Sequence, residues 1–303
     1  MKVWNRNKYA ALFLLPYTVL FLTFVVAPII YGFVISLHKW YILAPHPTYV
    51  GLANYSAVLK DDLFRIAFMR TAFFVVMVVP AGNALSLLLA VGLNQNYKGT
   101  TFYKVAYYLP VLTSVTVVAI LWRWLYSSEF GLLNYYLNKV GFAAHTMAPG
   151  IFSGKWTVNW LSDTKTAMPA IALLSVWWGA GGNMLIYLAG LKNVPKELLE
   201  AAEIDGCTPF QRFWAVTWPL LKPTTLFCLV MSVIGSFQVF GQTYILTGGG
   251  PYYSTLTVIL YMFQQGFSQY QMGYASAVGY VLFAAVLVFT VLQFKLLSVK
   301  RDG

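Results

Sequence analysis

Polar side chains that could bind a ligand without covalent chemistry lie inside two long uncharged stretches, 166–191 and 223–294. An asparagine amide can donate and accept hydrogen bonds, and an indole ring offers a flat face to the C–H bonds of a ring-shaped ligand. Ser232, Ser236 and Val239 share one helical face by their i, i+4, i+7 spacing. The expected wall of a ligand pathway comprises Trp178, Gly179, Gly182 and Asn183, and the candidates on the next span are Ser232, Gly235, Ser236, Gln238 and Val239. The alternative is that these residues only pack membrane helices closely together.

Residues for catalysis or metal binding do not form any recognisable pattern. The sequence contains no G-x-x-x-x-G-K-[ST] phosphate-binding loop and no pair of acids inside an uncharged stretch. The three histidines are scattered over expected loops, and the two cysteines suggest neither a disulfide nor a metal site. We therefore expect no enzymatic activity, no metal and no cofactor in this chain, so that any energy source lies in another protein.

The segment 192–222 is the longest polar interruption of the apolar carboxy-terminal half. Pro195 suits the first position of a helix, and Gly206 is expected to end that helix because glycine adopts left-handed backbone without steric cost. Thr208 and Gln211 have the spacing of a capping box, which predicts that a second helix opens at once.

Pro219 is expected to stop this second helix. The helix carries a broad aromatic face before that proline, made by Phe210, Phe213, Trp214 and Trp218. The segment also holds four of the nine acidic residues of the chain, Glu197, Glu200, Glu203 and Asp205. Such acidity is unfavourable on an anionic lipid surface, so we expect a protein partner here.

The composition is that of a membrane protein: 59% of the residues are hydrophobic and 10% are charged, against about 25% charged in globular proteins. Five uncharged runs predict six helical spans, because the run 223–294 is long enough for two and Arg123 can extend the shortest run by reaching the membrane interface. Their approximate limits are 10–36, 71–93, 105–126, 167–191, 223–246 and 273–294.

The distribution of lysine and arginine predicts the orientation of these spans. The two termini and the loops 94–104 and 192–222 hold 12 basic residues in 60 positions, whereas the opposite segments hold 8 in 104. The positive-inside rule therefore places both termini and the segment 192–222 in the cytoplasm. The net charge of +11 follows from this bias and from the scarcity of acids, so no nucleic-acid partner is needed to explain it.

The segment 192–222 resembles the cytoplasmic EAA loop of permease subunits in binding-protein-dependent ATP-binding-cassette (ABC) importers. That pattern is E-A-A, three residues, G, nine residues, I-x-L-P. Glu200, Ala201, Ala202, Gly206 and Pro219 match it at that spacing, while Val216 and Trp218 replace the preferred Ile and Leu. The longer agreement, followed by the sequence LTGGGP at 246–251, is similar to the carbohydrate branch of the family, typified by permeases for maltose and glycerol phosphate.

The resemblance implies an all-α membrane protein with the type I importer fold: one permease domain, 1–303, with cytoplasmic coupling helices. The implied ATPase-coupling residues are Glu200, Ala201, Ala202, Asp205, Gly206 and Pro219. The resemblance also places the stripe formed by Ser232, Ser236 and Val239 in the fifth span at a mid-membrane substrate site. The implied partners are a second homologous permease subunit, an ATPase dimer that binds ATP and magnesium, an extracytoplasmic solute-binding protein and a sugar. The implied location is the plasma membrane of a bacterium or archaeon.

A secondary carrier and a membrane scaffold are the alternatives to an importer permease. A secondary carrier would favour internal repeats and an ionisable residue inside a span, and the sequence indicates neither. A membrane scaffold without a transport role would leave uptake intact on deletion. The substrate also stays open: amides and aromatics favour an uncharged sugar, whereas Arg65, Arg70 or Arg123 could meet a phosphate from outside.

Overall fold

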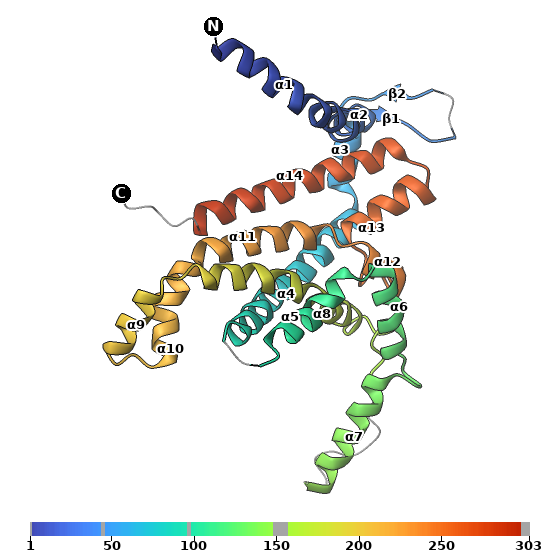
Figure 1. The fold of residues 1–303 in the computed structure, drawn as a ribbon. Coiled ribbons are helices and arrows are strands. Elements are labelled where there is room, and N and C mark those ends of the chain that lie inside the picture. Colours follow the sequence, from blue (N-terminus) through green and yellow to red (C-terminus); the bar gives the residue numbers. More distant parts are fainter. Residues whose placement is uncertain (1, 44–45, 96–97, 148–156, 298–303) are drawn as a thin grey trace. The chain divides into compact units, whose positions relative to one another are not determined.

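The computed structural model describes residues 2–43, 46–95, 98–147 and 157–297. Over these residues five helical segments are long and apolar enough to cross a membrane, and a sixth crossing results if one bent helix pair counts as a span. The expected all-α membrane fold is confirmed, apart from a two-stranded hairpin of β1 (His38–Lys39) and β2 (Thr48–Tyr49). Figure 1 shows the course of the chain.

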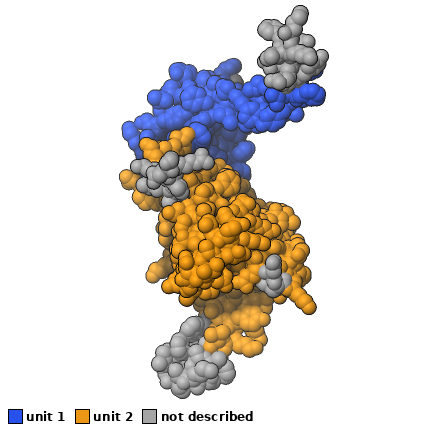
Figure 2. All heavy atoms as spheres, turned by 60° about the vertical axis from the view of Figure 1, so that its left-hand side comes forward, with its two compact units in different colours: residues 1–64, 261–284 blue, residues 65–260, 285–303 orange. Residues whose placement is uncertain are grey.

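The chain divides into two compact units, coloured separately in Figure 2. The first unit comprises residues 1–64 and 261–284. Besides the hairpin, it contains α1 (Lys2–Phe21), the π-helical turn η1 (Leu22–Val26), α2 (Ala27–Ser36), α3 (Ala53–Lys60), the π-helical turn η3 (Gln264–Ser268) and the first half of α14 (Met272–Leu297).

Close backbone contacts hold the first unit together. Gly273 lies so near the His38 carbonyl that an added Cβ would be 1.9 Å from its oxygen, and the Gly273 N–H donates to the Trp40 carbonyl at 3.2 Å. The Tyr280 hydroxyl donates to the Ile29 carbonyl. The absence of a side chain at Gly273 thus permits the hairpin to approach the start of α14.

A carboxylate cluster in the same unit joins segments about two hundred residues apart in sequence. Oδ2 of Asp61 accepts hydrogen bonds from the Tyr261 hydroxyl and, at 2.5 Å, from the Tyr274 hydroxyl. Oδ1 accepts from the backbone N–H groups of Leu63 at 2.8 Å and Phe64 at 3.4 Å, so Asp61 caps the helix that follows it. Partial burial opposes ionisation, but these four hydrogen bonds outweigh it and lower the pKa of Asp61 below its ordinary value.

The second unit comprises residues 65–260 and 285–303. Its helices are α4 (Asp62–Leu93, from Arg65 on), α5 (Thr100–Leu112), α6 (Val115–Leu125), α7 (Leu132–Met147), α8 (Ala167–Lys192), α9 (Lys196–Ile204), α10 (Pro209–Arg212), the π-helical turn η2 (Phe213–Thr217), α11 (Trp218–Phe237), α12 (Gly241–Leu246), the start of α13 (Val258–Phe263) and the second half of α14. Among the described residues, its core includes an apolar cluster around Tyr126 and Ile171 and another around Met184 and Leu221. At Gly181 an added Cβ would lie 2.1 Å from the Tyr107 carbonyl oxygen, so this glycine sets the close approach of α5 and α8.

The expected third span, 105–126, is not one straight helix. α5 and α6 meet at an angle of 98°. Thr113 Oγ1 donates to the Pro110 carbonyl at 2.5 Å, and the Ser114 side chain caps α6 by accepting from the Val117 N–H at 3.4 Å. These hydroxyls satisfy backbone groups that the break leaves unpaired, which is how membrane helices tolerate an interruption.

The helix around the expected fifth span also differs from the prediction. One continuous helical segment runs from Pro209 to Phe237, whereas 223–246 was expected. Pro219 does not stop the helix, so that prediction is wrong. The π-helical turn η2 precedes it, with the Trp218 N–H bonded to the Phe213 carbonyl, and this wider turn accommodates the proline.

Candidate functional site

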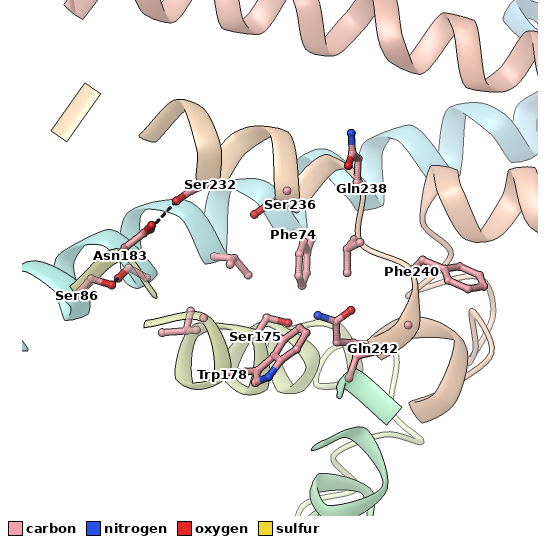
Figure 3. Close-up of a pocket in the computed structure, with 18 residues that line it drawn as sticks. Phe74, Ser86, Ser175, Trp178, Asn183, Ser232, Ser236, Gln238, Phe240 and Gln242 are labelled. Carbon is pink, nitrogen blue, oxygen red and sulfur yellow. Dashed lines mark hydrogen bonds between the residues drawn. The ribbon is translucent and has the colours of Figure 1, made fainter. Parts of the chain in front are cut away.

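A cavity of about 480 Å³ lies in the second unit among α4, α8, the end of α11 and the start of α12 (Figure 3). Its 18 lining residues, all within the described chain, include no Asp, Glu, Lys, Arg or His. Aromatic rings, hydroxyls and amides make up its polar and flat surfaces instead. This size lies within the range of about 300–1,000 Å³ that is usual for small-molecule sites.

Eight of the nine residues expected on a ligand pathway line this cavity. Gly182 is the exception, since the nearest atom to an added Cβ there is Val111 Cγ1 at 3.9 Å. The expected helical stripe is partly wrong, because α11 ends at Phe237 and Val239 lies beyond it. Val239 nevertheless lines the cavity with Ser232 and Ser236, because residues 238–242, which follow the helix, are also part of the cavity wall.

Five lining residues with suitable chemistry were not predicted: Phe74, Ser86, Ser175, Phe240 and Gln242. In Figure 3 the Gln242 amide lies across from Ser236, and Phe74 faces Trp178 over the gap. Phe74 and Ser175 sit in ordinary apolar runs, and Gln242 lies in the six-residue helix α12 that hydropathy does not distinguish from a span. No local sequence signal marks them.

A hydrogen-bonded cluster forms one end of the cavity and joins three helices. The Asn183 amide of α8 donates to Ser232 Oγ of α11 at 2.9 Å, and the Asn83 amide of α4 donates to the same oxygen at 3.1 Å. Asn83 also donates to the Val79 carbonyl at 2.8 Å and accepts from the Tyr187 hydroxyl at 3.4 Å. Asn83 is buried and does not line the cavity, as expected for a residue that packs helices.

Threonine hydroxyls hold the segment that follows α11 and so fix the other end of the cavity. Thr257 Oγ1 donates to the Val239 carbonyl at 3.0 Å, and Thr71 Oγ1 accepts from the Val258 N–H at 3.0 Å. Gly241 lies against Val115, where an added Cβ would be 2.8 Å from the valine Cγ1. Two helix breaks, after α5 and after α11, therefore meet beside the cavity.

The loop 192–222 forms the two helices that were predicted. Pro195 is the N-cap of α9 rather than its first residue, Gly206 has a φ of +79°, and Thr208 and Gln211 form a complete capping box. The Cys207 N–H donates to the Ala202 carbonyl at 3.0 Å and the Gly206 N–H to the Glu203 carbonyl at 3.1 Å, the paired bonds of a Schellman cap. Glu203 also pairs with Arg212 at 2.9 Å, which ties α9 to α10.

Most of the expected coupling residues are exposed. Glu200, Ala201, Asp205 and Gly206 lie on the surface of the loop, whereas Ala202 is buried. Apolar residues are exposed beside them, with Leu198 at 47% and Ile204 at 87% exposure. Pro219 is exposed but lies within the continuous helix rather than at its end. α9 thus presents exposed acidic and apolar side chains, and of its acids Glu203 is ion-paired with another described residue.

Comparison with known proteins places these features in a family. The family described as the binding-protein-dependent transport system inner membrane component matches residues 82–301. The arabinooligosaccharides transport system permease protein AraP of Bacillus subtilis is 36% identical over 99% of this chain and 92% of its own length. The trehalose/maltose transport system permease protein MalF of Thermococcus litoralis is 32% identical over 99% of this chain and 97% of its own.

The fold agrees with that of a solved transporter. A chain of a bacterial ABC transporter involved in the import of the acidic polysaccharide alginate superimposes with a TM-score of 0.81, at 22% identity and over 98% of both chains. The architecture is that of a type I importer permease. The chain belongs to the family of inner-membrane components of binding-protein-dependent transport systems.

Proposed function

We propose that this chain forms half of the translocation pathway of an ATP-driven importer for an uncharged carbohydrate. The observation that carries the proposal is the charge-free cavity lined by Trp178, Phe74, Gln242 and the serines of α8 and α11. Sugars combine hydroxyls with apolar C–H faces, so amides, hydroxyls and aromatic rings suit them. The relatives named for arabinooligosaccharides and for trehalose and maltose support this substrate class.

A phosphorylated polyol is a poorer fit to this cavity. Phosphate is bound best by arginine or lysine, and the cavity wall of this subunit contains neither. Arg65, Arg70 and Arg123, which could have met a phosphate, do not line the cavity. A relative of similar identity, 33%, is named for sn-glycerol-3-phosphate, so identity alone does not distinguish the two substrates.

The exposed face of α9 is proposed to dock on the ATPase. Ile204 and Leu198 would be covered by apolar groups of that partner, and Glu200 would pair with a cation or a hydrogen-bond donor there. Apolar exposure next to acids is typical of a protein interface. The full complex would contain a second permease subunit, two ATPase subunits that bind ATP and magnesium, and an extracytoplasmic binding protein.

The orientation follows from the distribution of basic residues and not from the fold. Both termini and α9 would lie in the cytoplasm of a bacterial or archaeal cell, with the turn 247–257 outside. A secondary carrier is less consistent with the cavity, because ion coupling commonly uses an acid or histidine at membrane depth and the lining offers none.

The test is uptake by the complex reconstituted in proteoliposomes, using the sugar that mass spectrometry finds on the purified binding protein. Ser236→Trp should fill the cavity and abolish uptake while basal ATP hydrolysis persists. Ser236→Ala removes only a hydroxyl, and Gly182→Ala adds a methyl group off the cavity, so both should retain uptake. Uptake at the normal rate by Ser236→Trp would show that the sugar does not pass through this cavity.

A further inference from the structure

A second pocket of about 740 Å³ lies apart from the cavity and shares none of its lining residues. It is bounded by the last turn of α6, the turn 126–130, the turn 161–162 and the segment 246–251. By the proposed orientation this pocket opens on the extracytoplasmic side.

Arg123 is the positively charged residue of this pocket. It lies in the last turn of α6, is exposed, and makes no ion pair with any acid in the described part of the chain. Glu129 follows in the adjoining turn but does not line this pocket. The guanidinium is thus available to a carboxylate from another molecule.

Aromatic residues line the same pocket as this arginine. Trp124 is 50% exposed and Phe130 is 64% exposed, and both line the pocket with the buried Tyr126. Arginine, tryptophan and tyrosine are the residue types that contribute most strongly at protein–protein interfaces when they lie in a preformed hollow. The composition favours a protein over a lipid headgroup, which would need the cation but not a walled pocket.

Hydrogen bonds fix two walls of the pocket, the end of α6 and the segment 246–251. The Tyr126 hydroxyl donates to the Ala170 carbonyl at 2.7 Å, which fixes the end of α6 to α8. Opposite, Thr255 Oγ1 donates to the Gly250 carbonyl at 2.7 Å and the Gly250 N–H donates to the Thr247 carbonyl at 3.0 Å. A preformed site loses less conformational entropy when it binds a partner.

We infer that the Arg123 pocket is a docking site that binds an aspartate or glutamate side chain of the solute-binding protein. The inference rests on the proposed function in one respect, namely that a binding protein delivers the substrate to this chain. The carboxylate accepts hydrogen bonds from the guanidinium, and the indole of Trp124 shields the pair from water.

The test titrates the binding protein, saturated with its sugar, against the complete transporter in lipid nanodiscs and measures ATP hydrolysis. Arg123→Ala should raise the half-stimulating concentration of binding protein about tenfold, with the maximal rate unchanged. Arg123→Lys keeps the charge but loses the planar fork, so its effect should be smaller. Lys139→Ala removes an exposed charge on α7 outside the pocket and should leave that concentration within about twofold of wild type.

Two further measurements test whether a charge pair forms at Arg123: the salt dependence of stimulation, and an exchange of the two charges between the partners. Raising the salt from about 50 to about 300 mM should weaken stimulation of the wild type more than that of Arg123→Ala. A photo-crosslinker at Trp124 identifies the opposing acid, and replacing that acid by arginine should restore the affinity lost in Arg123→Glu.

The inferred docking site would be wrong if wild type and Arg123→Ala had equal half-stimulating concentrations. It would also be wrong if the exchanged charge pair did not restore the affinity for the binding protein. Either result would leave the proposed function intact. A wild-type complex that no binding protein stimulates would overturn both.

Discussion

Asn183 Nδ2 donates a hydrogen bond to Ser232 Oγ at 2.9 Å, and so two predicted pathway residues from α8 and α11 are direct partners. The same serine oxygen accepts from Asn83 of α4. The Ser232 hydroxyl therefore links α4, α8 and α11 at one end of the cavity. The two interpretations of these polar residues, pathway and packing, are not exclusive, since Asn183 and Ser232 line the cavity while they bind each other.

Removing that hydroxyl should destabilise the protein more than removing another from the same cavity. Ser232→Ala deprives two amide groups of their shared acceptor and should cost about 1–2 kcal/mol. Ser175→Ala is the matched control, because the Ser175 hydroxyl donates to the Ile171 carbonyl of its own helix at 2.8 Å and its loss leaves no amide unpaired. Thermal unfolding of the two purified variants measures the difference, and equal shifts would contradict the shared role of Ser232.

Local signals in the sequence predicted the loop 192–222 well. The capping box and the left-handed Gly206 depend on residues within three or four positions of each other, so the pattern alone specifies them. Pro219 was misjudged because the π-helical turn before it has no comparable signature.

Longer-range features could not be predicted in the same way. Hydropathy measures average polarity and does not locate a break in an uncharged run, so neither the bend at Thr113 nor the end of α11 at Phe237 was foreseen. Asp61 meets Tyr261 and Tyr274 only through the fold, across about two hundred positions. The residues of the cavity wall were predictable where glycine, serine and asparagine cluster in α8 and α11, and not at isolated positions such as Phe74 and Ser175.

Gly206 should be required for its backbone conformation and not for space. Its φ is +79°, and no atom lies within 4 Å of an added Cβ. Gly206→Val should cost about 1 kcal/mol or more and misdirect α10, whereas Gly206→Asn should be tolerated because asparagine adopts left-handed backbone more readily. The yield of ATPase that co-purifies with each variant is the measurement. Normal yields with both would mean that the turn at Gly206 does not orient the coupling helix.

Glu200→Lys should weaken ATPase association without removing the protein from the membrane. The side chain is exposed, so the substitution disturbs little inside this chain but places a positive charge where the partner is expected to offer a cation or a donor. Lys192→Ala, also at an exposed position near α9, should be mild. Co-purification and substrate-stimulated hydrolysis distinguish the two variants, and a Glu200→Lys complex with normal values for both would exclude a coupling role.

Cysteine labelling tests the orientation, and the structure selects the positions. Tyr252 is 90% exposed whereas Ser254 is 1% exposed, so Tyr252 is the suitable external site. In a background with Cys207 and Cys228 replaced by serine, Tyr252→Cys should react with an impermeant maleimide only from outside and Gln211→Cys only from the cytoplasmic side. The reverse pattern would invert the topology and remove the basis for placing the ATPase at α9.

The carboxylate of Asp61 should stabilise the protein in its ionised form. Its folded-state pKa lies below its ordinary value of 3.8, so the unfolded chain takes up the proton first as the pH falls. The stabilisation is therefore complete above pH 3.8, declines as the pH drops below it, and is lost once the pH passes the folded pKa.

Asp61→Asn keeps a capping oxygen for Leu63 but not a charged acceptor for both tyrosines, so wild type should melt higher than this variant at neutral pH. The gap should persist down to about pH 4 and narrow below it. Asp62→Asn, an exposed neighbour, controls for the change in net charge. A melting gap that stays constant down to about pH 2.5 would show that the hydrogen bonds from Tyr261 and Tyr274 to ionised Asp61 do not cause the difference in stability.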